Sequence, residues 1–438
     1  MSQRPSLDDG TRPGALAGVR VLEFAQAMAI PICGVLLSDM GAEVIKIEPP
    51  EGDAFRKTQL PIIPGESKGY TVLNRGKRSI CLDVGSPESR PIVAKLVANA
   101  DVVLMSLKPA DLPRYGLTYE AFSAIKPDII YLENVPLGPE GPFGQDGGYD
   151  VVVQGISGSG AITARSTGDA PMNIRPAYID MGTGFLSALG VVAALRHRDL
   201  TGQGQRVQTS LLGTGLTLAN QLVSWFGATD PPLEDAFNQD LAEAQARGAG
   251  YEEQRALYEK HFLRGAYGNI YFRHYRTKDG FISIGCLSPA LNARFRAVTG
   301  VADPRQEPGF DIGTQEGYDR LTRMIAESEA TLASRTTKDW IGAFREGGVP
   351  CGPFNFPPQV FSDEQVLANE FVVELDHPLL GPYKTFAAPI RMDATPTRIY
   401  GASPLLDGDT DTVLAELGFS EDEIAAWRAS GVVGAAGE

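Results

Sequence analysis

The sequence predicts an α/β protein with a parallel β-sheet and a second, smaller unit of strands and helices. Two observations support this prediction. Before about residue 210, short apolar runs typical of strands alternate with helical patterns, which indicates a parallel sheet covered on both faces. After Trp225 the composition becomes acidic, and a new set of strand and helix patterns begins at Tyr275. The 438 residues are enough for both units.

The first elements form a βαβ unit. Residues 19–24 (VRVLEF) are predicted as a strand, residues 31–40 as a helix that ends at Gly41, and residues 43–47 (EVIKI) as the next strand. The alternation then continues through strand 80–82, helix 87–100, strand 102–105, helix 119–125, strand 129–132, helix 182–197 and strand 206–210.

The second half of the chain is predicted to leave this sheet and to return to it. Residues 226–266 are expected to form an acidic, partly helical linker, and residues 267–344 a small domain. The expected elements there are a hairpin turn at 277–280, strand 281–284 and helices 289–298 and 319–328. The turn-rich residues after 349 and helices 410–417 and 421–430 complete the large domain, which we assign to residues 1–225 and 345–438.

The composition disfavours several classes of function. A net charge of −15 argues against nucleic acid as a partner, because binding to a phosphate backbone needs a basic face. The four cysteines contain no CxxC pair and there are only four histidines, so we expect no metal site and a reducing, cytoplasmic environment. No apolar run approaches 18 residues, so no membrane span is expected, and the polar first 14 residues are expected to be a disordered arm.

The first strand-to-helix turn does not have the pattern of a dinucleotide site. Residues 24–29 (FAQAMA) contain no glycine, whereas a GxGxxG turn needs glycines so that the pyrophosphate can approach the backbone. The basic segment 74–79 (NRGKRS) is a candidate for binding a phosphate-bearing ligand, and a solvated basic turn is the alternative. Lys108 and Arg114 follow strand 102–105 and add cations at the same expected edge of the sheet.

Asp180 precedes two closely spaced glycines and a long apolar helix. Its carboxylate has two interpretations that the pattern does not separate: an N-cap, or a nucleophile held at the positive end of the helix dipole with the glycines leaving room for substrate. The glycine-rich segment 155–160 (GISGSG) also has two interpretations: it is a flexible loop near a pocket, or it provides backbone N–H donors to an oxyanion.

Several segments together resemble the class III coenzyme A transferases, the family that includes formyl-CoA transferase, the carnitine-CoA enzymes and α-methylacyl-CoA racemase. The resemblance extends over about 400 residues, and no single segment decides it. Its segments are 16–23 (LAGVRVLE), 39–50 (DMGAEVIKIEPP), 74–79 (NRGKRS), 201–207 (TGQGQRV), 348–353 (GVPCGP) with Asn355, 376–378 (DHP) and 416–418 (ELG).

The resemblance implies a fold, an activity and site residues. It implies a large Rossmann-like domain built from both chain ends, a small inserted domain, and two chains interlocked as a homodimer. The implied activity is transfer of coenzyme A from an acyl-CoA to a carboxylic acid, with Asp180 as the covalent nucleophile. The positions implied to contact CoA are Met28, Ala29, Asn74, Arg75, Lys77, Lys108, Arg114 and Asp150.

The chain also departs from the family pattern. The ENFRPG-like segment is replaced by residues 105–110 (MSLKPA), the SGFG-like segment by 134–138 (NVPLG), and no four-glycine loop occurs, the nearest equivalent being 265–269 (GAYGN). These changes disfavour oxalate as the acceptor. Two alternatives remain open: an acyl-CoA racemase or isomerase, although Tyr149 stands where that branch has a histidine, and a non-catalytic CoA-binding subunit.

Overall fold

The computed structural model describes residues 14–263 and 268–435 and divides the chain into two compact units. The large unit consists of Met1–Trp225 and Asn369–Glu438, and the small unit of Phe226–Ala368. Residues 1–13 of the predicted arm, the boundary at residue 266 and part of segment 265–269 lie outside the described residues.

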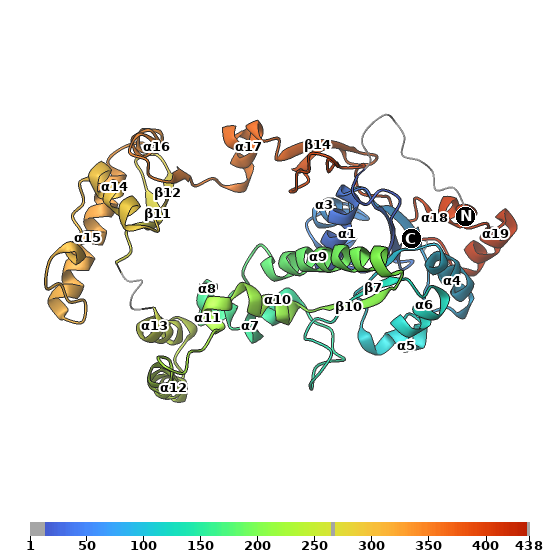
Figure 1. The fold of residues 1–438 in the computed structure, drawn as a ribbon, viewed down its shortest axis with the longest axis horizontal. Helices are drawn as coiled ribbons and strands as arrows, with labels where there is room; N and C mark the ends of the chain where they lie inside the picture. The colour runs from blue at the N-terminus through green and yellow to red at the C-terminus, as the bar shows by residue number, and fades with distance from the viewer. Residues whose placement is uncertain (1–13, 264–267, 436–438) are drawn as a thin grey trace. The chain divides into compact units, whose positions relative to one another are not determined.

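The large unit contains a six-stranded sheet (Figure 1). All five pairings between neighbouring strands are parallel, as the sequence predicts. The strand order is β10-β7-β6-β1-β2-β5, with β1 Arg20–Phe24, β2 Glu43–Glu48, β5 Arg78–Cys81, β6 Val102–Met105, β7 Ile130–Asn134 and β10 Gln205–Thr209. The chain extends the sheet from β1 to one side through β2 and β5, and then returns to place β6 on the other side of β1.

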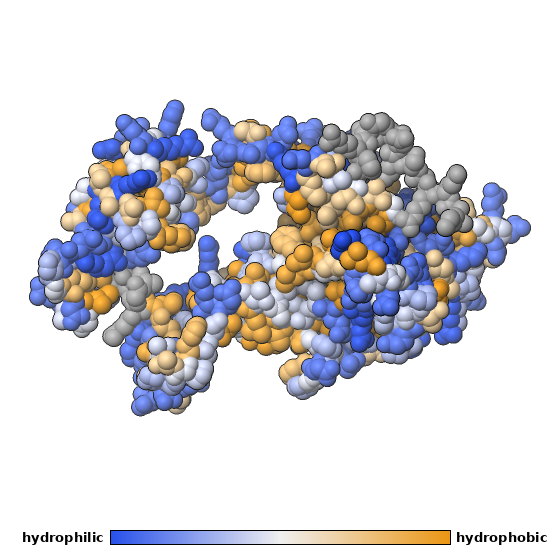
Figure 2. Space-filling view, viewed as in Figure 1, coloured by the Kyte–Doolittle hydropathy of each residue, from blue (hydrophilic) through white to orange (hydrophobic). Residues whose placement is uncertain are grey.

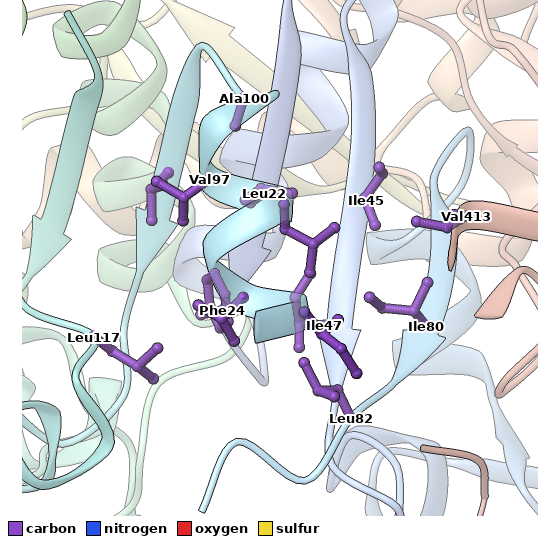
Figure 3. Packing of buried hydrophobic residues seen from close by; sticks show 14 of the residues in the cluster. Leu22, Phe24, Ile45, Ile47, Ile80, Leu82, Val97, Ala100, Leu117 and Val413 are labelled. Atoms are coloured by element: carbon purple, nitrogen blue, oxygen red, sulfur yellow. The ribbon is translucent and has the colours of Figure 1, made fainter. Parts of the chain in front are cut away.

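Helices cover both faces of this sheet, because side chains of each strand alternate between two hydrophobic clusters. On one face, Leu22 and Phe24 belong to a cluster with α4 (Arg90–Ala98), α6 (Tyr119–Ile125) and the C-terminal helices α18 (Thr410–Glu416) and α19 (Glu421–Ser430) (Figure 3). On the other face, Val21 and Val44 pack with α1 (Ala29–Asp39) and α9 (Tyr178–Thr201).

The C-terminal segment also covers the edge strand β5. The Ser79 N–H donates to the Asp409 carboxylate, and the Cys81 N–H donates to the Thr410 hydroxyl. Because these groups occupy donors that an edge strand would otherwise expose, both ends of the chain are needed to complete the large unit.

Helix α9 is the one described helix that is long and apolar enough to cross a membrane. It nevertheless packs on the sheet, since Ala188, Val191, Ala194 and Leu195 lie in the cluster formed with the strands. One side of its apolar surface is therefore buried against the sheet, while Phe185, Leu189 and Val192 are exposed.

The small unit contains an antiparallel sheet of β11 (Phe272–Arg276), β12 (Phe281–Gly285) and β13 (Cys351–Pro353). Helices α14 (Pro289–Thr299), α15 (Gln315–Ala333) and α16 (Thr337–Glu346) enclose its core around Phe295, Trp340 and Phe344. The region expected to be an acidic, partly helical linker contains two helices, α12 (Pro231–Ala246) and α13 (Tyr251–Phe262), and both belong to the small unit. The large domain resumes at residue 369 rather than 345, because α16 and β13 belong to the small core and sheet.

The remaining elements are mostly short and, apart from the 3₁₀ turn Pro87–Ser89 within the predicted helix 87–100, were not expected from the sequence. They are α2 Phe55–Thr58, β3 Pro61–Ile63, β4 Glu66–Ser67, α3 Lys68–Leu73, α5 Leu112–Tyr115, α7 Asp150–Ile156, α8 Ser159–Thr163, β8 Ser166–Thr167, β9 Ala170–Pro171, α10 Leu211–Leu218, α11 Asn220–Val223, α17 Glu364–Ala368, β14 Val372–His377 and β15 Gly381–Phe386, with 3₁₀ turns Pro87–Ser89, Pro109–Asp111, Pro304–Gln306 and Pro357–Ser362.

Candidate active site

A pocket lies at the carboxyl ends of the strands, where the strand order reverses between β1 and β6. In open parallel sheets this position is the usual place for a ligand. The pocket has a volume of about 280 Å³. Its lining follows four strands: Phe24, Ala25 and Gln26 after β1, Ile47 and Pro49 at β2, Leu82 to Gly85 after β5, and Leu107, Lys108, Asp111 and Tyr115 after β6.

Two of the predicted CoA-contacting cations are at this pocket. Lys108 lines it and is exposed. Arg114 is also exposed, and its guanidinium lies over the ring of Tyr115, which is a lining residue, 4.6 Å from the centroid. Lys108 is therefore accessible to an anionic ligand from water, and Arg114, which lies 3.9 Å from the Asp111 carboxylate and donates to the Tyr115 hydroxyl, is exposed beside it.

The basic segment 74–79 differs from these exposed cations, and it is not a solvated turn. The side chains of Asn74, Arg75 and Lys77 are buried. Arg75 is paired with the two carboxylate oxygens of Asp39, and the Lys77 ammonium lies 2.8 Å from the Glu23 carboxylate. Burial lowers the pKa of Lys77 to about 8, although the attraction of Glu23 opposes this shift.

Asp180 lies in the first turn of α9, but it is not the N-cap. The N-cap residue is Ala177, which provides no side-chain cap. The capping carboxylate comes instead from Asp150, the first residue of α7, whose Oδ2 accepts hydrogen bonds from the Ile179 N–H at 2.9 Å and the Asp180 N–H at 3.0 Å. In the described parts of the chain, no hydrogen bond or ion pair reaches the Asp180 carboxylate. The N-cap interpretation of Asp180 is therefore wrong.

The surroundings of Asp180 disfavour its negative charge. Burial first, and then the negative charge of Asp150, raise the pKa of Asp180 to about 7. A carboxylic acid with a pKa near neutrality, in a partly buried position without a partner, has the properties of a functional group rather than of a structural one.

Packing brings four of the predicted positions together. Ala29, Val153 of α7 and Ile179 form one hydrophobic cluster, so the start of α1 lies against the turns that carry Asp150 and Asp180. Met28 and Met181 both pack against a neighbouring cluster. The structure thus joins Met28, Ala29, Asp150 and Asp180 in one region.

The sequence suggested that the glycines after Asp180 leave room for a substrate. The structure shows that they do not. A Cβ atom on Gly184 would lie 1.8 Å from Ile32 and 2.5 Å from the Ala29 carbonyl oxygen. A Cβ atom on Gly182 would meet Thr214 and Leu218, both at 3.1 Å. The glycines instead allow α9 to pack closely against α1 and α10.

The glycine-rich segment 155–160 is the junction between α7 and α8 rather than a free loop. Within it, the N–H groups of Ser157 and Gly158 already donate to the backbone carbonyls of Val153 and Gly155 in α7. Those amides are therefore not available to an oxyanion.

Sequence reasoning missed Gln154. Its side-chain amide donates to Asp150 and to the Ile174 carbonyl, and its oxygen accepts from the Ile174 N–H. Gln154 thus ties the capping carboxylate to the segment that enters α9. A helix prediction for residues 150–156 would have revealed it, because Asp150 and Gln154 are four residues apart.

Comparison with known proteins identifies the class. Residues 16–410 match CoA-transferase family III, and the chain belongs to this family. It is 32% identical to a succinate–glutarate CoA-transferase of Agrobacterium fabrum, over 94% of this chain and 97% of that protein. It is 29% identical to a formyl-CoA:oxalate CoA-transferase of Rhodopseudomonas palustris, over 96% and 97%.

A solved structure shows the same fold. A CAIB/BAIF family protein from Brucella suis superposes with a TM-score of 0.71 at 28% identity, covering 93% of this chain and all of that one. The family resemblance and the prediction of a CoA-transferase are confirmed, and CoA thioesters are the substrates. In residues 14–263 and 268–435 no group of three or more His, Cys, Asp or Glu side chains is arranged to hold a metal.

Proposed function

We propose that this CoA-transferase works through a covalent bond to Asp180. The observation that carries the proposal is the division of roles at the start of α9: Asp150 caps the helix, and the Asp180 carboxylate is left without a partner. The helix dipole favours the anion there, while burial and Asp150 disfavour it. The balance keeps the carboxylate reactive near neutral pH.

The proposed reaction has four steps. One Asp180 oxygen attacks the carbonyl of the donor thioester, the C–S bond breaks, and a mixed anhydride and the CoA thiolate result. The thiolate attacks the Asp180 carbonyl, giving an aspartyl-CoA thioester and the donor carboxylate. The acceptor carboxylate and then the returning thiolate repeat these two steps in reverse. Covalent catalysis of this kind divides one difficult exchange into easier steps.

The pocket between β1 and β6 is proposed to hold the nucleotide end of CoA. Lys108 and Arg114 supply positive charge at its rim. The turn after β1 contributes Ala25 and Gln26 to the pocket and continues to Met28 and Ala29 beside α9. A ligand that follows this turn runs from the cations toward Asp180.

The site supports transfer better than racemisation. A racemase needs bases on both faces of the α-carbon. Asp150 is engaged by two backbone N–H groups and by Gln154, and its neighbour Tyr149 has a phenol in place of a stronger base. The unpartnered Asp180 also argues against a non-catalytic subunit.

We further propose that the protein is an interlocked homodimer. The large unit exposes apolar side chains along α9, α10 and α11, and Figure 2 shows this hydrophobic surface. They include Phe185, Leu189, Val192, Leu216, Leu218, Leu222 and Val223. Exposed apolar areas of this kind are typical of subunit interfaces. Light scattering should give twice the chain mass of 46.9 kDa, and a stable monomer would contradict the proposal.

A trapping experiment tests the nucleophile. The protein is incubated with succinyl-CoA and then with hydroxylamine, and the peptides are analysed by mass spectrometry. A mass change on the peptide containing Asp180 is expected in the wild type and not in Asp180→Asn. Asp199→Asn, at an exposed position on the same helix, is the matched control and should be labelled like the wild type. A label at another residue would contradict the proposal.

A second experiment identifies the acceptor: transfer of CoA from succinyl-CoA and acetyl-CoA is measured with a panel of carboxylic acids.

A further inference from the structure

The turn between β1 and α1 has a backbone conformation that its sequence does not favour. Ala27 has a φ of 67°, in the left-handed region where a residue with a side chain is strained by roughly 1–2 kcal/mol. No glycine occurs between Phe24 and Ala29. Other parts of the molecule must therefore hold this turn, which carries Met28 and Ala29 and lines the pocket with Ala25 and Gln26.

Two buried charged side chains bind the backbone of this turn, and a third binds the first turn of α1 directly after it. The Lys46 ammonium donates to the Ala25 carbonyl at 2.7 Å, and the Asp53 carboxylate accepts from the Ala27 N–H at 3.3 Å. The Lys77 ammonium donates to the Pro31 carbonyl at 2.9 Å. The turn is thus held at Ala25 and at the strained Ala27, and the helix that follows it is held at Pro31.

The same side chains neutralise one another around Glu23. Its carboxylate lies 3.2 Å from the Lys46 ammonium and 2.8 Å from that of Lys77, and Asp53 lies 2.9 Å from Lys46. All four side chains have no exposed surface, and together they carry two positive and two negative charges. We call Glu23, Lys46, Asp53 and Lys77 the charge cluster.

Lys77 has no donor left for a ligand. Within 3.1 Å its ammonium meets five oxygen atoms, which belong to Glu23 (two), Pro31, Leu73 and Asn74. Asn74 in turn donates to the Tyr70 carbonyl. The fold also makes space for this ion pair, because a Cβ atom on Gly34 of α1 would lie 2.0 Å from the Glu23 carboxylate and 3.1 Å from the Lys77 side chain.

We propose that the charge cluster is a positioning device that holds the β1–α1 turn in its ligand-binding conformation. It replaces the conformational freedom that glycines give to the corresponding turn of dinucleotide-binding proteins. Lys77 and Asn74 then affect CoA through the turn and not by contact with phosphate. The inference rests on the proposed function, since it assumes that CoA binds along this turn.

Substrates with and without phosphates separate positioning from phosphate contact. We compare kcat/KM for succinyl-CoA and for the succinyl thioester of pantetheine, which has no phosphate. Lys77→Met is expected to lower both values by the same factor, tenfold or more. Lys108→Met, at the exposed pocket cation, is expected to lower the value for succinyl-CoA alone. Lys68→Met, at an exposed lysine in α3, is the matched control and should change neither.

A penalty of Lys77→Met that disappears with the pantetheine thioester would show phosphate contact and overturn the proposal, and so would unchanged activity with both substrates. If the wild type transfers nothing from either thioester, it is the proposed function that fails. If Lys77→Met does not fold, the same two kcat/KM values are compared in the double variant Glu23→Gln/Lys77→Met. The double variant removes one charge of each sign and leaves Lys46 paired with Asp53. Loss of folding in both variants would mean that the cluster stabilises the whole unit, which also overturns the proposal.

Discussion

Two groups of carboxylates in the large unit, one fully buried and one only partly buried at Asp180, differ in how their charges are paired. In the charge cluster each carboxylate faces an ammonium group at 3.2 Å or less. At the start of α9, Asp180 and Asp150 have like charges, and Asp180 has no partner in the described parts of the chain. Paired charges hold backbone in place, whereas an unpaired carboxylate at a helix start keeps its oxygens available for a reaction.

The largest expected effect comes from removing the unpaired carboxylate. Asp180→Asn should lower kcat by roughly 10⁴-fold or more, because an amide cannot form the anhydride. The fold should survive, since Asp150 and not Asp180 caps α9. Steady-state kinetics and circular dichroism measure both quantities. Activity close to that of the wild type would remove Asp180 from the mechanism.

Removing the paired charge of Arg56, which lies outside the charge cluster, should act on stability instead. Arg56 is buried and pairs with Glu48 and Glu66, each at 2.8 Å. Arg56→Met leaves both carboxylates without a cation, so the free energy of unfolding should fall by about 3–5 kcal/mol. Arg90→Met, at an exposed arginine at the start of α4, is the control and should change it by less than about 0.5 kcal/mol. Urea unfolding measures the free energy of unfolding of both variants. Equal losses in Arg56→Met and Arg90→Met would contradict the prediction.

The contrast also marks what the sequence could and could not predict. The parallel sheet was predictable because short strand patterns alternate with helix patterns along the chain, and β6 and α6 have the predicted bounds. The basic segment 74–79 resembled an exposed turn, since Glu23, the partner of Lys77, is 54 residues away. The helix cap was missed for the same reason, because Asp150 lies 30 residues before Asp180. Local patterns carry no information about such distant pairs.

The unpaired carboxylate should make stability depend on pH. The pKa of Asp180 is about 7 in the folded protein and about 3.9 in an unfolded chain, so the folded protein binds more protons between these values. The stability from this group is present below about pH 4 and is lost as the pH rises through 7. Asp180→Asn should therefore gain stability over the wild type between pH 4 and 7, on the order of 1–2 kcal/mol because the carboxyl is partly exposed. Urea unfolding at pH 5 and 8 measures the gain, and a gain that is larger at pH 5 would contradict the assignment.

The smallest expected effect separates the two actions of Asp150, its hydrogen bonds and its charge. The wild-type kcat/KM should fall about tenfold per unit below pH 7, as Asp180 becomes protonated. Asp150→Asn keeps an oxygen that can accept from the Ile179 and Asp180 N–H groups but removes the negative charge. The pKa of Asp180 should then fall while staying above its ordinary value, because burial is the larger cause of the shift.

The acid limb of the pH profile of Asp150→Asn should consequently move to lower pH. At pH 6 the variant should retain a several-fold larger fraction of its maximal activity than the wild type. Asp146→Asn, at an exposed position just before α7, should leave the profile unchanged. A limb that stays near pH 7 in Asp150→Asn would show that Asp150 acts on Asp180 only as the cap of α9.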